Sequence, residues 1–323
     1  MNLFKELQKN FPEIKEKVCL KEYTTFKIGG PAKYFLKVSD KEKLIMVIKK
    51  TIEFKIPFII IGGGSNILFP SNGYDGLVIL YKKEKTTEPL NKKKIDEGKY
   101  LIHVDAGLLL SSLIFELKDF SGLEWAIGIP GTLGGAINGN AGAINESISS
   151  VIEDVDFLEI NKNKVLEKIY KKEDCLFGYR ASIFKNNPNL LITGATLNVC
   201  KNDEKLINEK IIFNLKNRNT KQPRGFSAGS IFKNYYGKID EEILLKYREL
   251  DNRNFIPAGL LIELAGLKGK KFGGAKISED HANFIINFND ATSEDVLNLI
   301  KIIKKEVKKL FFINLQEEIK ILK

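Results

Sequence analysis

Three polar residues that lie far apart in the chain carry side chains suited to an acidic substrate and a proton transfer. Arg180 stands in the stretch FGYRAS, and its planar guanidinium suits a carboxylate or a phosphate. Ser230 stands in SAGSIFKN, where a cation and an amide follow its hydroxyl. Glu318 alternates with apolar residues near the end of the chain. Each also has an ordinary interpretation: a structural ion pair for Arg180, a turn for Ser230 and a solvent-exposed carboxylate for Glu318.

A first glycine segment, GGGSN at 62–66, follows a predicted buried strand. Consecutive glycines let neighbouring backbone N–H groups turn toward one point, which forms an anion-binding nest. Ser65 and Asn66 add side-chain donors. The spacing is not GxGxxG, and Pro70 prevents a following helix, so a Rossmann dinucleotide fold is not indicated. A plain glycine turn is the alternative.

A second glycine segment covers residues 128–142 and reads GIPGTLGGAINGNAG. So many glycines without low complexity indicate a backbone packed closely against a ligand or against another segment. A pyrophosphate would fit such a segment. Two glycine loops from different lobes favour a dinucleotide lying between lobes, because pockets are common at such interfaces. Tight packing of turns remains the alternative.

Other catalytic motifs are missing from the sequence. His103 and His281 are far apart and have no HxxxH spacing, and Cys19, Cys175 and Cys200 form no CxxC pair, so neither a metal site nor a disulfide framework is predicted. No GxSxG, SxxK or Walker A motif occurs. The chemistry is therefore expected to come largely from a cofactor.

Periodic apolar residues predict the elements that position these side chains. Residues 39–53 place apolar side chains at helical spacing after a Ser39 or Asp40 cap, and residues 58–61 form a buried strand. A helix is expected over residues 293–310. The alternation that follows it, over residues 312–322, predicts a final strand.

Two polar segments divide the chain. Residues 81–99 are rich in Lys, Glu, Thr and Asn and are expected to form a solvated linker. A helix over residues 202–219 should end before Pro223. The fold class is therefore α+β with three lobes, over residues 1–80, 81–218 and 219–323.

Composition limits the partners. The chain has 323 residues, 43% of them hydrophobic, and a net charge of +10. Only five of its 51 basic residues are Arg, whereas proteins that read nucleic acid depend on Arg, so no nucleic-acid partner is expected. No apolar run reaches the ~18–20 residues of a membrane span, and no signal peptide is visible, so a cytoplasmic protein without membrane insertion is expected.

Taken in order, several segments together resemble the UDP-N-acetylenolpyruvoylglucosamine reductase family. They are TTFKIGGPA at 24–32, IGGGSN at 61–66, GIPGTLGGA at 128–136, GYRAS at 178–182, AGSIFKN at 228–234, AGLLIELAGLKG at 258–269 and HANFIIN at 281–287. The ordered set is specific to that family, whereas a single glycine loop would not be. The chain is similar to the short subtype that lacks an extra tyrosine-bearing loop.

The resemblance implies an FAD-binding, vanillyl-alcohol-oxidase-like (PCMH-type) fold with a substrate-binding domain in the third lobe. NADPH would reduce the flavin, and hydride would then pass to the enolpyruvyl methylene carbon of UDP-N-acetylglucosamine enolpyruvate, giving UDP-N-acetylmuramate for peptidoglycan synthesis. A monomer without metal is expected. The implied FAD contacts are Gly62, Gly63, Gly64, Ser65, Asn66, Gly128, Pro130, Gly131, Thr132, Gly134, Gly135, Asn138, Gly139, Ala141 and Gly142.

The resemblance also implies roles for the three polar residues. Hydride addition leaves negative charge beside the substrate carboxylate, which calls for a cation and a proton donor. Arg180 would polarise the enolpyruvyl group, Ser230 would protonate the carbanionic carbon, and Glu318 would assist. The implied substrate contacts are Tyr179, Lys233 and Asn234.

The chain departs from the family pattern at Tyr23, Gly139, Tyr235 and Glu317, where Asn, Met, Pro and Pro are usual. These departures concern local loop shape. Glu318 is preferred to Glu317 because Glu317 shares the parity of the apolar face. An FAD-dependent oxidase on the same fold and a non-enzymatic nucleotide-binding module are the alternative functions.

Overall fold

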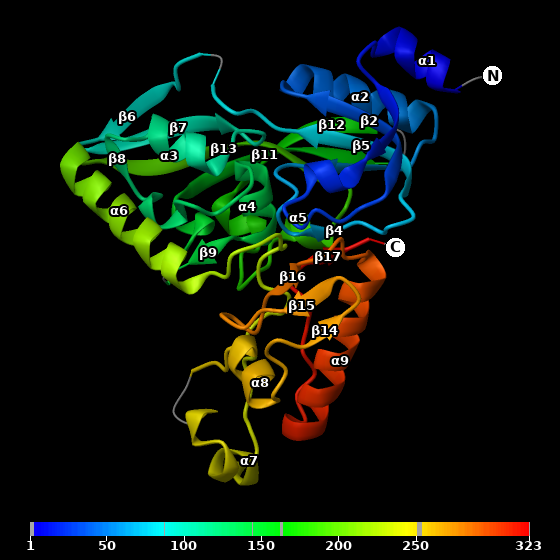
Figure 1. Cartoon of the computed structure of the whole chain (residues 1–323). Coiled ribbons are helices and arrows are strands. Elements are labelled where there is room, and N and C mark those ends of the chain that lie inside the picture. The colour runs from blue at the N-terminus through cyan, green and yellow to red at the C-terminus, as the bar shows by residue number, and fades with distance from the viewer. Residues whose placement is uncertain (1–2, 87, 144, 162–163, 251–253, 323) are drawn as a thin grey trace. The chain divides into compact units, whose positions relative to one another are not determined.

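The computed structural model describes residues 3–86, 88–143, 145–161, 164–250 and 254–322 (Figure 1). The chain forms two compact units, each built from separate stretches of sequence. Unit 1 comprises Met1–Val18, Ala32–Gly63 and Asp75–Thr220, and unit 2 comprises Cys19–Pro31, Gly64–Tyr74 and Lys221–Lys323. The three-lobe division at residues 80 and 218 stays a prediction.

One part of unit 1 is a four-stranded sheet with the strand order β1-β2-β5-β3. Its strands are β1 (Lys15–Cys19), β2 (Pro31–Val38), β3 (Phe58–Ile61) and β5 (Tyr74–Tyr81), and its helices are α1 (Leu3–Asn10) and α2 (Lys41–Glu53). The Asp40 side chain accepts a hydrogen bond from Lys43 N and caps α2. The buried face of α2 packs into the core through Leu44, Val47 and Ile48. The predicted helix and the predicted strand over residues 58–61 are confirmed.

The larger part of unit 1 is an antiparallel sheet with the order β12-β11-β13-β7-β6, and β8 pairs with β13. The strands are β6 (Lys92–Asp96), β7 (Lys99–Asp105), β8 (Phe120–Ser121), β11 (Ile152–Asn161), β12 (Lys164–Lys171) and β13 (Leu190–Lys201). The prediction of a linker over residues 81–99 is wrong in part, because β6 lies within it. All five residues of β6 are exposed on the edge of the sheet, so their composition is that of a loop.

Helices and short pairings complete unit 1. The helices are α3 (Leu110–Glu116), α4 (Leu133–Gly139), α5 (Ile183–Asn186) and α6 (Glu204–Lys221), and β9 (Gly142–Ala143) pairs with β10 (Glu146–Ser147). The predicted helix over residues 202–219 is confirmed by α6. A second apolar core, which includes Trp125, Phe157 and Phe184, fills this part of the unit.

Unit 2 contains the short helices α7 (Glu241–Lys246) and α8 (Ala258–Leu264) and the long helix α9 (Ser293–Phe311). A three-stranded sheet of β14 (Lys271–Phe272), β15 (Ala275–Ile277) and β16 (Ile285–Asn287) lies in the same unit. Thr292 and Asp295 form a capping box that begins α9. The predicted helix over residues 293–310 is confirmed.

In the last segment of unit 2, β17 (Lys320–Ile321) pairs in parallel with β4 (Ile67–Leu68), and Glu317 forms an isolated antiparallel bridge with Phe232. Ile313, Leu315 and Ile319 are buried, as the alternation predicted. The prediction of a strand over residues 312–322 is therefore right about which apolar side chains are buried. It is too long, because β17 covers only two of these residues. None of the helices in the described ranges combines the length and the apolar run that crossing a bilayer requires.

Candidate active site

The two glycine segments meet in unit 1. A Cβ atom on Gly63 would lie 2.6 Å from the Cα atom of Gly131, and one on Gly62 would overlap the hydroxyl of Thr132. A Cβ atom on Gly134 would lie 2.9 Å from the Cβ atom of Ala106. Close packing therefore requires glycine at these positions, as the alternative of tightly packed turns predicted.

Other glycines of the second segment leave room beside the backbone. A Cβ atom on Gly139 would meet nothing within 4 Å, and one on Gly135 would meet only the Thr132 hydroxyl, at 3.6 Å. Thr132 caps α4, because its hydroxyl accepts a hydrogen bond from Gly135 N at 3.3 Å. The close contact of the two loops on one side and the open side of α4 are compatible with a bound cofactor.

Arg180 lies in a tight turn that is fixed to the same glycine segment. Gly178 and Ala181 exchange two backbone hydrogen bonds of 3.1 Å, and the Asn140 amide donates to Gly178 O at 2.9 Å. The Arg180 guanidinium donates to Gly142 O at 3.0 Å. The Ser182 hydroxyl donates to Asn138 O at 2.7 Å.

The backbone of Arg180 has a φ angle of 52°, in the left-handed region that residues other than glycine rarely adopt. Such a conformation persists only where its surroundings hold it, and it is common at functional sites. The guanidinium carbon of Arg180 lies 5.4 Å from the centre of the Tyr179 ring. The structure thus brings the predicted catalytic residue Arg180 and the predicted substrate contact Tyr179 together, and it places Arg180 against the predicted cofactor residue Gly142.

In unit 2, the end of the first glycine segment is tied to the last strand. Gly64 has a φ angle of 61°, and a Cβ atom on it would overlap Tyr23 O. Asn66 donates from its amide to Glu318 O at 3.4 Å, and Asn66 O accepts from Lys320 N at 3.0 Å. Asn66 and Glu318, which the sequence separates, are neighbours in unit 2.

Ser230 lies beside the segment that carries Gln316 and Glu318. Glu318 N donates to Ile231 O at 2.8 Å, and Lys233 N donates to Gln316 O at 2.9 Å. On its other side, Ser230 forms a bridge with Phe284. The Ser230 hydroxyl makes no hydrogen bond within the residues that the structure describes. The structure therefore brings Ser230 and Glu318 together in unit 2, whereas Arg180 belongs to unit 1.

The two adjacent carboxylates of the last segment differ in their contacts. Glu317 forms an ion pair of 2.8 Å with Lys304 on α9. Asn234 also has a structural contact, since its side-chain oxygen accepts a hydrogen bond from Ala258 N at the start of α8. The ion pair gives Glu317 a structural partner, and the choice of Glu318 for the catalytic role stays a prediction.

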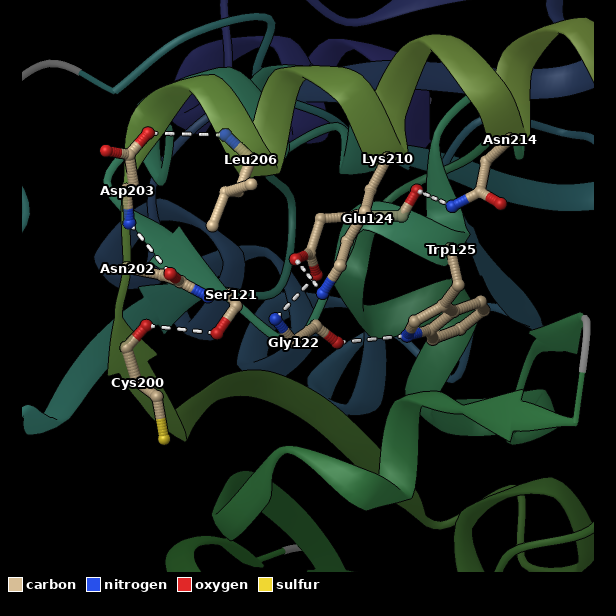
Figure 2. A network of polar contacts seen from close by, with 10 residues as sticks. All are labelled: Ser121, Gly122, Glu124, Trp125, Cys200, Asn202, Asp203, Leu206, Lys210 and Asn214. Carbon is tan, nitrogen blue, oxygen red and sulfur yellow. Dashed lines mark hydrogen bonds and ion pairs between the residues drawn. The ribbon is translucent and has the colours of Figure 1, made fainter.

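One polar cluster, which the sequence did not reveal, lies directly before the second glycine segment (Figure 2). The Glu124 carboxylate is 7% exposed, accepts a hydrogen bond from Gly122 N at 2.6 Å and lies 3.7 Å from the Lys210 ammonium. Asn214, one turn further along α6, donates to Glu124 O at 3.1 Å. These contacts fix α6 against the segment that leads to Gly128. The only sequence signal is an acidic residue between apolar ones in GLEWA.

A pocket of about 390 Å³ lies beside this cluster and contains none of the predicted site residues. It is lined by Ser121, Gly122, Glu124, Trp125, Glu146, Lys210 and Asn214. Further along α6, burial lowers the pKa of Arg218, whose side chain packs against Gly128. In the described part of the chain, no cluster of three or more His, Cys, Asp or Glu side chains has the arrangement of a metal site.

Two family models match the chain. A model described as "FAD binding domain" matches residues 32–163, and one described as "UDP-N-acetylenolpyruvoylglucosamine reductase, C-terminal domain" matches residues 221–322. A reductase of the latter name from Chlamydia felis (strain Fe/C-56) is 38% identical over 315 residues, which are 97% of this chain and 96% of that protein. The one from Clostridium novyi (strain NT) is 36% identical over 310 residues, covering 96% of this chain and 92% of that protein.

A solved structure is also similar over nearly the whole chain. The crystal structure of UDP-N-acetylenolpyruvylglucosamine reductase from Thermus caldophilus has a TM-score of 0.72 and 29% sequence identity. The match covers 96% of this chain and 100% of that one. These likenesses confirm the predicted α+β, vanillyl-alcohol-oxidase-like fold and the predicted cofactor, FAD.

Proposed function

Because the chain belongs to the UDP-N-acetylenolpyruvoylglucosamine reductase family, we propose that it reduces UDP-N-acetylglucosamine enolpyruvate to UDP-N-acetylmuramate with NADPH and FAD. The family consists of FAD-binding oxidoreductases of peptidoglycan precursor synthesis. The observation that carries the proposal beyond the family name is the contact of the Arg180 turn with the glycine segment, through Gly142 O at 3.0 Å. This contact ties a substrate-binding cation to the segment that would hold the cofactor.

The two glycine segments are proposed to hold FAD through their backbone N–H groups. Their contact at Gly63 and Gly131 and the open side at Gly139 fit this role. When bound, FAD supplies the hydride chemistry that links NADPH to the enolpyruvyl methylene carbon. One pocket would therefore serve NADPH and the UDP-sugar substrate in turn.

Arg180 is proposed to bind the enolpyruvyl carboxylate. Hydride addition to the methylene carbon moves an electron pair toward the neighbouring carbon and its carboxylate. A guanidinium stabilises that charge through paired N–H groups, and its held backbone keeps the group in one place. Tyr179 packs against the guanidinium and would contact the sugar nucleotide.

Ser230 is proposed to deliver the proton that completes the reduction. The carbon next to the carboxylate takes this proton, while the serine oxygen recovers one from solvent, so one hydride and one proton enter the product. Glu318, whose backbone N–H bonds to Ile231 O, would assist as an acid or hydrogen-bond partner. Lys233 and Asn234, which follow Ser230, are proposed substrate contacts.

An oxidase on the same fold is separated from this reductase by one anaerobic experiment. The purified protein is reduced by light without NADPH, and UDP-N-acetylglucosamine enolpyruvate is added without oxygen. The proposal predicts that the yellow flavin spectrum returns and that UDP-N-acetylmuramate is detected by mass spectrometry. Return of the yellow spectrum only on admission of oxygen would identify an oxidase instead.

The chain is further proposed to be a monomer and to be cytoplasmic. Gel filtration would test the first proposal, and cell fractionation would test the second.

A further inference from the structure

Asn283 holds the backbone of the segment that carries Ser230. Its side-chain oxygen accepts a hydrogen bond from Phe232 N at 3.0 Å, and its amide nitrogen donates to Phe232 O at 2.8 Å. Its backbone oxygen accepts from Ile231 N at 2.8 Å. Asn283 is 4% exposed, so water does not compete for these groups. The Asn283 side chain thus pairs with both backbone polar groups of Phe232, as a neighbouring strand would.

The same segment is also held by the residues around Glu318, which precede β17. Ile231 O accepts from Glu318 N, and Lys233 N donates to Gln316 O. Consecutive backbone groups from Ile231 N to Lys233 N are therefore all paired, and Asn283 supplies the partner for three of them. The segment that follows Ser230 is fixed on both edges.

The segment before Ser230 has partners other than Asn283. Ser227 O accepts a hydrogen bond from the Thr25 hydroxyl at 2.7 Å, and Phe226 O accepts one from Asn287 N at 2.9 Å. A change at Asn283 therefore reaches Ser230 through the residues that follow the serine. Loss of the Asn283 amide would leave the buried Phe232 N–H and C=O without partners, and the segment would shift to satisfy them.

We infer that Asn283 is a positioning residue for Ser230, and that its carboxamide holds the serine hydroxyl and Glu318 in one arrangement. The inference rests on the proposed proton-donor role of Ser230. Proton transfer depends on heavy-atom distance, so a displacement of about 1 Å costs roughly 100-fold in rate. A carboxamide offers a donor and an acceptor side by side at this length, whereas an ionised carboxylate has no donor.

The first test is a double-mutant cycle on the separated half-reactions. Asn283→Ala should slow reoxidation of the reduced flavin by UDP-N-acetylglucosamine enolpyruvate by roughly 10- to 100-fold, and reduction by NADPH by about two-fold at most. Ser230→Ala combined with Asn283→Ala should be no slower than Ser230→Ala alone, because both changes remove one function. Multiplied losses in the double variant would overturn the inference.

The second test covers the case in which Asn283→Ala fails to fold. Asn283→Asp places a carboxylate oxygen against Phe232 O when it is ionised, and burial raises the pKa of such a group. Once protonated, it again offers a donor and an acceptor. Reoxidation by the enolpyruvyl substrate should therefore recover, relative to the unchanged enzyme, as the pH falls through the raised pKa of the introduced carboxyl group. A ratio that stays constant at every pH at which both proteins are folded contradicts the inference.

Asn287 offers a matched control in the same unit. Its buried amide donates to Phe26 O at 3.1 Å and to Lys27 O at 3.2 Å, and its oxygen accepts from Ala291 N at 2.9 Å. Asn287→Asp should lower the melting temperature while the two half-reactions keep their ratio. If the unchanged enzyme does not reduce the enolpyruvyl substrate, the proposed function fails. If it does, and Asn283→Asp behaves like Asn287→Asp, the inference alone fails.

Discussion

The contact with Gly142 O sets Arg180 apart from exposed cations such as Lys17 and Lys55, which have the same strained backbone. A residue other than glycine in the left-handed region costs about 1 kcal/mol, and here the Gly178–Ala181 turn and the Gly142 contact hold it there. The sequence signal was weaker, since a rare Arg in a Lys-rich chain left a structural ion pair equally open.

Arg180→Lys keeps the charge and loses the planar fork. We expect kcat/KM for the enolpyruvyl substrate to fall roughly 10- to 100-fold, because bidentate binding of a carboxylate is lost. Steady-state kinetics and urea unfolding of the same preparation measure the effect. Arg248→Lys, a change in the short 3₁₀ helix Arg248–Leu250, is the control. Equal effects of the two substitutions would remove Arg180 from the site.

The adjacent carboxylates Glu317 and Glu318 are predicted to behave differently. Glu318→Gln should slow turnover more than Glu317→Gln does. The Glu317 ion pair with Lys304 is partly exposed, so Glu317→Gln should lower the free energy of unfolding by about 1 kcal/mol or less. Turnover rates and urea midpoints of both variants decide the assignment. The opposite ranking of turnover would assign the role to Glu317.

At the scale of elements, glycines within the two segments have different reasons to be there. Gly63 lies against Gly131, whereas Gly139 has open space at the end of α4. Gly63→Ala should therefore destabilise unit 1 by about 1–3 kcal/mol through overpacking. Gly139→Ala should be neutral or stabilise by up to about 1 kcal/mol, since alanine favours a helix. Urea unfolding of the FAD-free protein measures both, and similar losses at both positions would contradict the packing argument.

Elements with strong local signals were predictable. Helices α2 and α9 have apolar stripes and capping residues, and each was placed within two residues of its observed start. Strand β6 was missed because every side chain is exposed, so no alternation marks it. The cluster around Glu124 was missed for a different reason: its partner Lys210 comes from a helix about 86 residues later, and no local pattern joins them.

At the scale of the whole molecule, each unit is built from separate stretches of sequence. Local sequence patterns therefore do not predict contacts between those stretches. Thr25 donates from its hydroxyl to Ser227 O at 2.7 Å within unit 2, across 202 positions of sequence. Nothing local in residues 19–31 indicates that contact. The family resemblance was more informative than periodicity, because it linked the distant residues Ser230 and Glu318, whose segments are hydrogen-bonded neighbours in unit 2.

The three cysteines test the fold of the whole chain. Cys175 is buried, and burial raises the pKa of its thiol to about 12, whereas Cys19 and Cys200 are exposed. Because the thiolate is the reactive form, we expect iodoacetamide at about pH 8 to modify Cys19 and Cys200 and to spare Cys175 until the protein is unfolded. Peptide mass spectrometry reads out each site. Rapid modification of Cys175 in the folded protein would contradict its buried position.

The central claim is that one flavoenzyme takes electrons from NADPH and gives them to an enolpyruvyl sugar nucleotide, with Ser230 needed for the second step only. The measurement is an anaerobic stopped-flow experiment on the unchanged protein and on Ser230→Ala, with NADPH added first and UDP-N-acetylglucosamine enolpyruvate second. The account predicts that both proteins bleach with NADPH. The yellow spectrum should return quickly, with UDP-N-acetylmuramate, in the unchanged protein and far more slowly in the variant. A flavin that stays reduced in the unchanged protein would contradict the proposed reaction, and equal slowing of both steps in Ser230→Ala would contradict the proposed role of the serine.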